Sequence, residues 1–496
     1  WVRYTMLCSE AEEPFAAPVA QAYDVFVEAF DTGDEYETVD GMRESLAKSY
    51  DPARNGNIVL VLNKYDIFTE SDRGTSHGSP WDYDRHIPLI MYGKDVRKGV
   101  ALDDDAVQQD IVPTLAYRIG TDAPVTAEGR VLHEAFETRD GERPKVAVMM
   151  VLDQVAFRYL DEYKWALRNV RKIARDGVSY TNMRVPHLPT VTTVGHSALG
   201  TGAYPETTGI VGHNIYDPDL DAMVYAMEGG SPQYLEAETF ADVYDRSVGN
   251  RARIVSVGGA DRTAIGMAGH GTMSAGGDSD DVFWFEPDTG RFETNDAFYS
   301  MPDYLRGMDI MDYATPTFKG HTVDDPEVAM ASPALPIMMG DALVNVLENE
   351  DLGSSDVTDL LFANFKSPDY VGHAYGQGPE LFLTLLAVDR SIGRVKEKLD
   401  ELYGDDYLLV ITADHGAAPN PERTGGRRVH PDQFVERINA DFNGAVRFNE
   451  PAGGIMNLYV DEDALALQGK TLDDVKDTLE SYDEVFHAFT KDEIQS

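Results

Sequence analysis

Cysteine and long hydrophobic runs are nearly absent from this chain, and each absence narrows the possibilities. Cys8 is the only cysteine among 496 residues, which excludes an intrachain disulfide and a cysteine-based metal site. This composition fits a cytoplasmic protein, but a large secreted protein needs no disulfides either. No apolar run reaches the length of about 18 residues that a membrane-spanning helix needs, so we expect no such helix.

Basic residues are scarce. The chain has 42 lysines and arginines against 86 aspartates and glutamates, and its formal net charge is −44. Phosphate backbones and anionic membrane surfaces attract lysine and arginine, so the sequence argues against nucleic acid or a membrane as a partner. The acidic residues are spread along the chain, which predicts a solvated, repulsive surface of the kind used in salty surroundings. Residues 1–14 lack the long apolar stretch of a signal peptide, and we expect none in this segment.

Three short apolar runs end at acidic or histidine side chains. The runs cover residues 146–152, 360–365 and 407–413, and they are rich in Val, Leu or Met, as buried parallel strands are. The side chains that follow them are Asp153, Asp369, His373, Asp414 and His415. Ligands of open α/β sheets bind outside the carboxyl ends of the strands, so we expect these side chains at one edge. A mixed Asp/His set suits zinc or a similar divalent ion.

The order of strand and helix patterns predicts an α/β fold. We expect a doubly wound, mostly parallel central sheet flanked by helices, with an inserted cap region around residues 270–325. Further strands are expected at 57–63, 87–92, 253–257 and 455–460, and helices at 19–30, 41–48, 106–118, 160–174, 336–349 and 379–402. The predicted division is 1–130, packing into the same α/β domain, a linker at 131–145, a catalytic core at 146–420 and a smaller α+β segment at 421–496.

A segment rich in Thr, Ser and Gly precedes a helix-like stretch. It runs Leu-Pro-Thr-Val-Thr-Thr-Val-Gly-His-Ser-Ala-Leu-Gly-Thr-Gly over residues 188–202. A hydroxyl at a helix N-terminus beside a divalent metal can be held as an alkoxide, because the metal lowers its pKa and the helix dipole favours negative charge. Taken alone, a Thr here is more often a helix cap or a packing residue, so its interpretation depends on the residues around it.

Together these motifs resemble the alkaline phosphatase superfamily, most closely the branch of single-Thr alkaline phosphatases and nucleotide pyrophosphatase/phosphodiesterases. In that branch the nucleophile lies four residues before a motif His, which here is His196, so the resemblance implies that Thr192 is the nucleophile. The other matching segments are 146–154, Ser-Pro-Asp-Tyr-Val-Gly-His at 367–373, Thr-Ala-Asp-His-Gly at 412–416 and 75–88. The resemblance covers most of residues 55–460.

The resemblance implies two divalent metal ions, with zinc as the first choice and manganese or iron as alternatives. One implied ligand set is Asp369, His373 and His77, and the other is Asp153, Asp414 and His415, with Thr192 alongside. Thr192 would form a phosphoryl-enzyme that water then hydrolyses. The alternatives are a turn role for His77 and a helix-capping role for Asp153 and Asp414, while His196 is expected to orient its neighbours.

The order of the motifs is rotated relative to the family. In the family the motif of His77 comes last and the strand of Asp153 comes first, whereas residues 1–130 of this chain carry what resembles the family's C-terminal part. The polar stretch 121–145 then joins this part to the usual start. The resemblance therefore predicts a circular permutation, in which the two ends of this chain lie close together.

The residues that would clamp a phosphate are altered. His213 stands where the family often has an Asn, with Asn214 next to it. The phosphomonoesterase branch has Lys-Asp-Arg in a segment that resembles residues 258–265, and here Ala260 replaces the Lys while Arg262 remains. A monoester carries one more negative charge than a diester, so the missing Lys should weaken transition-state stabilisation by about 1–3 kcal/mol. Arg262 retains a forked donor suited to phosphate or sulfate.

The sequence predicts a metal-dependent hydrolase of small-molecule phosphate esters. The first choice is an alkaline-phosphatase-type phosphomonoesterase whose catalytic residues are Thr192, Arg262, His213 and Asn214. The alternatives are a phosphodiesterase or nucleotide pyrophosphatase, which the missing Lys favours, a sulfatase or phosphonate hydrolase, and a metal-binding protein that has lost catalysis. The resemblance suggests a periplasmic or secreted location, and the sequence does not give the oligomeric state.

Overall fold

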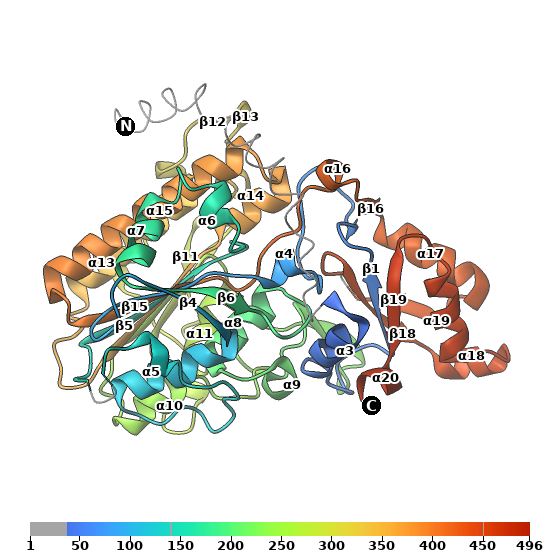
Figure 1. Cartoon of the computed structure of the whole chain (residues 1–496), viewed down its shortest axis with the longest axis horizontal. Coiled ribbons are helices and arrows are strands. Elements are labelled where there is room, and N and C mark those ends of the chain that lie inside the picture. Colours follow the sequence, from blue (N-terminus) through green and yellow to red (C-terminus); the bar gives the residue numbers. More distant parts are fainter. Residues whose placement is uncertain (1–36, 139–140, 450) are drawn as a thin grey trace.

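The computed structural model describes residues 37–138, 141–449 and 451–496. Two β-sheets organise these residues, a nine-stranded central sheet and a four-stranded sheet at one side of the molecule (Figure 1). The helix expected at 19–30 and the single cysteine, Cys8, lie outside the described residues. Within the three described ranges, every helix is too short or too polar to cross a membrane.

The central sheet is mostly parallel. Its strands, in spatial order, are β11 (Arg291–Glu293), β10 (Asp281–Glu286), β9 (Ile254–Gly258), β14 (Asp359–Phe365), β5 (Val146–Leu152), β15 (Tyr407–Thr412), β3 (Leu89–Gly93), β6 (Val178–Arg184) and β4 (Val100–Val107). The strands from β10 to β15 in this order run parallel to one another. β3 is antiparallel to both of its neighbours, β11 is antiparallel to β10, and β4 is parallel to β6.

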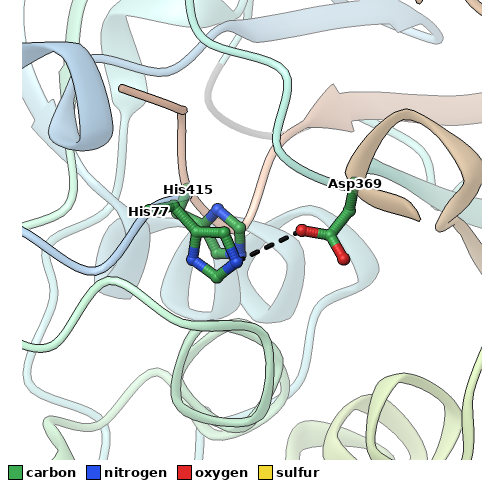
Figure 2. A group of neighbouring side chains, drawn as sticks. All are labelled: His77, Asp369 and His415. Atoms are coloured by element: carbon green, nitrogen blue, oxygen red, sulfur yellow. Dashed lines mark ion pairs between the residues drawn. The ribbon is translucent and has the colours of Figure 1, made fainter. Parts of the chain in front are cut away.

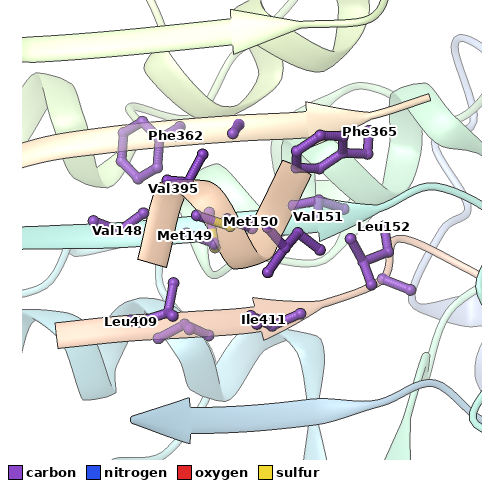
Figure 3. Packing of buried hydrophobic residues seen from close by; sticks show 14 of the residues in the cluster. Val148, Met149, Met150, Val151, Leu152, Phe362, Phe365, Val395, Leu409 and Ile411 are labelled. Atoms are coloured by element: carbon purple, nitrogen blue, oxygen red, sulfur yellow. The ribbon is translucent and has the colours of Figure 1, made fainter. Parts of the chain in front are cut away.

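The three central strands are apolar because both faces of the sheet are covered. Every residue of β5, β14 and β15 is buried. One face is covered by α7 (Arg168–Asp176), α13 (Ala334–Asn349) and α15 (Pro379–Tyr403), and the other by α5 (Ile111–Ile119), α8 (Thr192–Thr201), α10 (Phe240–Ser247) and α11 (Asp261–Ala268) (Figure 1). Figure 3 shows Met149 and Phe362 of the strands close to Val395 of α15. The structure confirms the predicted α/β fold with a mostly parallel central sheet flanked by helices.

Several segments differ from the sequence-based expectation. The sequence patterns do not predict β4 or β6, and the exposed Asp103, Asp104 and Asp105 of β4 hide its strand pattern. The helix expected at 106–118 begins later, at α5, because the chain is still in β4 up to Val107. The helix expected at 160–174 divides into α6 (Tyr159–Glu162) and α7. Within the expected cap, β10 and β11 extend the central sheet.

Shorter helices and strands connect the elements of the two sheets. They are β2 (Ile67–Phe68), α4 (Asp82–Arg85), α9 (Pro205–Thr208), β7 (Asn214–Asp217), β8 (Ala222–Tyr225), β12 (Thr317–Phe318), β13 (His321–Thr322), α12 (Pro326–Met330), α14 (Ser367–Tyr375), α16 (Pro421–Thr424) and β16 (Arg428–Val429).

The four-stranded sheet combines residues from the two ends of the described chain. Its order is β17 (Val446–Phe448), β18 (Ile455–Val460), β1 (Ile58–Leu62) and β19 (Val485–Thr490), so β1 lies between two C-terminal strands, antiparallel to both (Figure 1). Ile58, Leu60 and Leu62 share a buried cluster with α17 (Pro431–Phe442) and α19 (Leu472–Glu480). Val59 and Val61 share another with α3 (Val39–Ala47) and α20 (Lys491–Ile494). Both faces of β1 are therefore buried, which explains its unbroken apolar run.

The first and the last described helices lie against each other. Met42 and Leu46 of α3 belong to the same buried cluster as Ile494 of α20. The N-terminal residue itself lies outside the described ranges. The expected proximity of the two chain ends, the circular permutation and the proposed domain boundaries therefore stay predictions.

Replacing Leu60 with alanine is expected to lower the free energy of unfolding by about 2–5 kcal/mol, because its fully buried side chain would leave a cavity between β1 and α17. Urea unfolding of the metal-free protein measures the change. The matched control is Leu467→Ala in α18 (Glu462–Leu467), because Leu467 is 90% exposed. Equal unfolding midpoints for the two variants would contradict the packing of β1 between the C-terminal strands.

Candidate active site

Three adjacent parallel strands bring their carboxyl ends to one edge of the central sheet. β5 lies between β14 and β15 and is parallel to both. Asp153 follows β5 directly, Asp414 follows β15 after one residue, and Asp369 lies in the first turn of α14, just beyond β14. Their exposed fractions are 0%, 0% and 3%. The fold thus places three buried carboxylates together, as expected for the carboxyl edge of a parallel sheet.

The first predicted ligand set is compact. His77 Nε2 and His373 Nε2 each lie 3.2 Å from Asp369 Oδ1, and the two nitrogens lie 3.1 Å apart. Tetrahedral zinc with bonds of about 2.0–2.1 Å separates its ligand atoms by about 3.3 Å, so this triangle fits the ion. His77 Nδ1 donates to the Thr190 carbonyl and His373 Nδ1 to the Thr75 carbonyl. These bonds leave both Nε2 atoms free to face Asp369.

His77 reaches the site on a loop that needs a glycine. Gly74 has a φ of +80°, and a Cβ at this position would lie 1.8 Å from the carbonyl oxygen of His373. The Thr75 amide donates to the Gly372 carbonyl at 2.9 Å. The loop approaches α14 this closely because residue 74 has no side chain. His77 is therefore held by the fold, which argues against a plain turn role.

The second predicted set lies beside the first. His415 Nε2 is 3.2 Å from Asp414 Oδ2 and 3.8 Å from Asp153 Oδ1. The rings of His415 and His77 stack with centroids 3.7 Å apart, and Figure 2 shows this pair facing Asp369. His415 therefore borders both sets, and a ring nitrogen of His415 also lies within 4.8 Å of ligand atoms of His77 and Asp369 in the first set.

Charge within the second set fits a cation. Asp414 Oδ2 is buried and has no hydrogen-bond partner among the described residues. Burial raises the pKa of Asp414 well above its usual range, and the neighbouring Asp153 raises it further. A buried carboxylate pair with an unpaired oxygen is unfavourable unless a positive charge lies between them. The donor atoms and their charge thus suit a divalent ion.

Thr192 is the first residue of α8. Its hydroxyl lies 3.4 Å from His415 Nε2, and the side chain is 1% exposed. Gly195, one turn into the helix, would place a Cβ 2.9 Å from the Asp414 Cβ. The absence of that Cβ lets the helix N-terminus come close to the end of β15, and the helix dipole favours negative charge there. The structure brings Thr192 to the second ligand set.

Three further polar residues hold the ligands in place. Asn364 Nδ2 donates to Asp153 Oδ2 at 3.0 Å and to His196 Nε2 at 2.9 Å. His196 Nδ1 donates to the Thr192 carbonyl, so both ring nitrogens of His196 are hydrogen-bonded within the site. Gln154 Nε2 donates to Asp369 Oδ1 at 2.9 Å. Buried bonds of this kind fix the direction of ligand oxygens.

Lys366 is the residue that the sequence analysis missed. Its ammonium group contacts Asp153 Oδ1 at 3.0 Å, Thr192 Oγ1 at 2.9 Å and Asp369 Oδ2 at 2.5 Å, and the residue is 1% exposed. Burial opposes the charge, but Asp153 and Asp369 outweigh it and raise the pKa of Lys366. Conversely, burial would raise the pKa of Asp369, but Lys366 and then His373 hold it well below its usual range. Like Asn364 and Gln154, Lys366 lies at or just beyond the carboxyl end of a predicted strand, but this position alone does not show that the side chain points inward.

The predicted clamping residues border the site. Arg262 lies in the first turn of α11, and its Nε is buried without a hydrogen-bond partner among the described residues. Burial opposes its charge, but Tyr225, Tyr370 and Asp261 raise the pKa of Arg262 above its ordinary value. His213 Nδ1 lies 2.5 Å from Thr193 Oγ1, and burial lowers the pKa of His213 well below its usual range. Burial therefore disfavours the charged form of His213, whereas Arg262 keeps its charge.

A cavity of about 330 Å³ opens next to the first ligand set. His77 and His373 line one part of it, and the rest is lined by residues that include His213, Asn214 and Asn449. Asn449 Nδ2 donates to the Asn214 carbonyl at 2.7 Å, which links β7 to the segment before β18. A small molecule in this cavity would contact β18 of the four-stranded sheet as well as His77 and His373.

Comparison with known proteins relates the chain to phosphate ester hydrolases. A family model described as type I phosphodiesterase / nucleotide pyrophosphatase matches residues 147–496. Alkaline phosphatase PafA of Elizabethkingia meningoseptica is 27% identical over 434 residues, which span 73% of this chain and 78% of that protein. Alkaline phosphatase PhoD of Zymomonas mobilis is 28% identical over 410 residues, spanning 71% of this chain and 69% of that protein.

The fold agrees with these relationships. The crystal structure of wild-type PafA superposes with a TM-score of 0.59 at 24% identity, and the match covers 71% of this chain and 80% of that one. The family model begins at β5 and covers well over half of the chain. The chain therefore belongs to the type I phosphodiesterase / nucleotide pyrophosphatase family within the alkaline phosphatase superfamily, and it is a hydrolase of phosphate esters.

Proposed function

We propose that this protein hydrolyses phosphate monoesters, with Thr192 as covalent nucleophile at a site for two divalent metal ions. One observation carries the proposal. The Thr192 hydroxyl sits at the N-terminus of α8, beside His415 and the ammonium group of Lys366, where the two compact ligand sets meet. A hydroxyl in this position can be stabilised as an alkoxide.

The residues divide into two ligand groups. Asp369, His77 and His373 would hold one ion, and Asp153, Asp414 and His415 would hold the other. When bound, the ions supply Lewis-acid stabilisation of the charge that develops on the attacking and leaving oxygens. Histidine and carboxylate donors suit zinc, and they also accept manganese or iron.

The chain's own residues carry the reaction in two steps. Thr192 gives its proton to solvent and its oxygen bonds to phosphorus, while the substrate oxygen leaves as an alkoxide with the electrons of the broken P–O bond and takes a proton from water. Water then attacks the phosphoryl-threonine, releasing inorganic phosphate and restoring the hydroxyl. Asn364 and Gln154 keep the carboxylates aligned throughout, while Arg262 provides a fixed positive charge for the phosphoryl oxygens.

The choice of monoesters follows from the relatives. PafA and PhoD are alkaline phosphatases, and they resemble this chain along most of its length. The second candidate is phosphodiester hydrolysis. It is favoured by Ala260, an uncharged residue at the position where the monoesterase branch has a lysine, and by the description of the family model.

Steady-state kinetics test the proposal. We expect kcat/KM for p-nitrophenyl phosphate to exceed that for bis-p-nitrophenyl phosphate in zinc-loaded protein. Chelation should abolish both activities and added zinc should restore them. The metal ions would supply the Lewis-acid stabilisation of the attacking and leaving oxygens, and Lys366 and Arg262 do not replace it. A preference for the diester would move the protein to the second candidate, and activity that survives complete metal removal would contradict the metal-dependent site.

A further inference from the structure

The ammonium group of Lys366 lies at the reacting centre. It is within hydrogen-bond distance of the Thr192 hydroxyl and of one carboxylate from each predicted ligand set, Asp153 and Asp369. The side chain enters from the turn between β14 and α14 and is almost completely buried. A buried lysine is unfavourable without a negative partner, and Asp153 and Asp369 would also bind metal ions, so the placement of Lys366 here points to a chemical role.

Lys366 also lies directly beside the position where the expected lysine is missing. A Cβ on Gly259 would lie 2.4 Å from the Cβ of Lys366, so the backbone before Ala260 touches the base of this side chain. Tyr370 joins the two turns, because its hydroxyl donates to the Gly259 carbonyl at 3.1 Å and its ring lies 5.4 Å from Lys366 Nζ. The ammonium group therefore reaches the same edge of the sheet from the neighbouring strand.

The charges of the site leave a role for this lysine. Asp153, Asp369 and Asp414 with a Thr192 alkoxide carry four negative charges, which two divalent ions would cancel. Lys366 and Arg262 then remain as two positive charges. A phosphate monoester dianion matches two such charges, whereas a diester carries only one negative charge.

We propose that Lys366 is a catalytic residue that supplies the ammonium group absent at position 260 and sets a preference for monoesters over diesters. The inference rests on the proposed function and names its substrate class. Nζ lies 2.9 Å from Thr192 Oγ1, so a phosphoryl group on this oxygen would have its own oxygens within reach of the ammonium group. A charged donor at this point binds the additional negative charge of a monoester.

The decisive variant is Lys366→Met, which keeps the length of the side chain and removes its charge. We expect kcat/KM for p-nitrophenyl phosphate to fall about 10- to 100-fold, the effect of losing a charged hydrogen bond. The affinity for inorganic phosphate, measured by titration calorimetry on metal-loaded protein, should fall in parallel.

The kcat/KM of Lys366→Met for bis-p-nitrophenyl phosphate should change much less than its kcat/KM for the monoester. Adding Ala260→Lys to Lys366→Met should restore part of the monoester rate. Lys94→Met, which removes a lysine that follows β3 and pairs with Asp406, is the matched control.

Metal content separates this role from a structural one. If Lys366 serves instead as a counter-charge in place of one metal ion, Lys366→Met will bind one more ion than the wild type, and the inference fails. Equal losses on monoester and diester would also overturn it. If the wild-type protein hydrolyses neither ester, the proposed function fails, but the inorganic phosphate affinities of the wild type and Lys366→Met still decide whether Lys366 contacts phosphate.

Discussion

Replacing Thr192 with alanine is expected to lower kcat by about 10⁴- to 10⁶-fold, the range seen when a hydrolase loses its covalent nucleophile or the groups that act with it. The substitution removes the one hydroxyl that contacts both His415 and Lys366. The six Asp and His ligands proposed for the two ions remain, so metal content should stay at the wild-type value. Single-turnover kinetics with p-nitrophenyl phosphate, together with metal analysis, measure both quantities.

Two further variants make the result specific. Thr192→Ser keeps a hydroxyl and should retain measurable turnover. Thr201→Ala removes an equally buried hydroxyl in the last turn of α8, which donates to the Ser197 carbonyl and accepts from the Ala203 amide, away from both ligand sets, so turnover should be unchanged. Intact-mass analysis of rapidly quenched wild-type protein should show one added phosphoryl group that is absent from Thr192→Ala. Normal turnover by Thr192→Ala would show that another group attacks phosphorus.

The central fold was predictable because its signal is local. The strands β5, β14 and β15 are buried on both faces, so their apolar runs are continuous and visible in the sequence. β6 and β4 were not predictable in the same way. β4 closes the end of the sheet and exposes its acidic residues, and its pairing with β6 depends on a parallel contact between segments distant in sequence. Non-local pairing of this kind leaves little local pattern.

The site was predictable where resemblance supplied a motif. The structure brings together all seven predicted ligands, including His77, which is separated from Asp369 by most of the central domain. That these seven residues bind metal ions stays a prediction. Lys366 carried no motif, because a single lysine in a sequence usually lies on a solvated surface. Only the fold shows that the residue after β14 turns inward, between Asp153 and Asp369.

Replacing Asp369 with asparagine is expected to lower the affinity of one metal ion by about 100-fold or more, since the loss of a residue that merely supports a ligand already costs about 10- to 100-fold. Asparagine keeps the shape but removes the charge that His77, His373 and Lys366 share. Metal content measured after dialysis should fall from two ions to one per chain, and monoester turnover should fall with it.

The control for Asp369→Asn is another buried carboxylate. Asp389 of α15 is 2% exposed and accepts bonds from the Val170 amide and the Asn169 side chain, far from the ligand sets. Asp389→Asn should reduce stability without changing the metal content. If Asp369→Asn keeps two ions, the first set is wrongly assigned, and the stacked His415 becomes the candidate that completes it, since its ring already lies within ligand range of Asp369 and His77. If both ions are lost, the two sets bind cooperatively, as expected when His415 borders both and Lys366 joins their carboxylates.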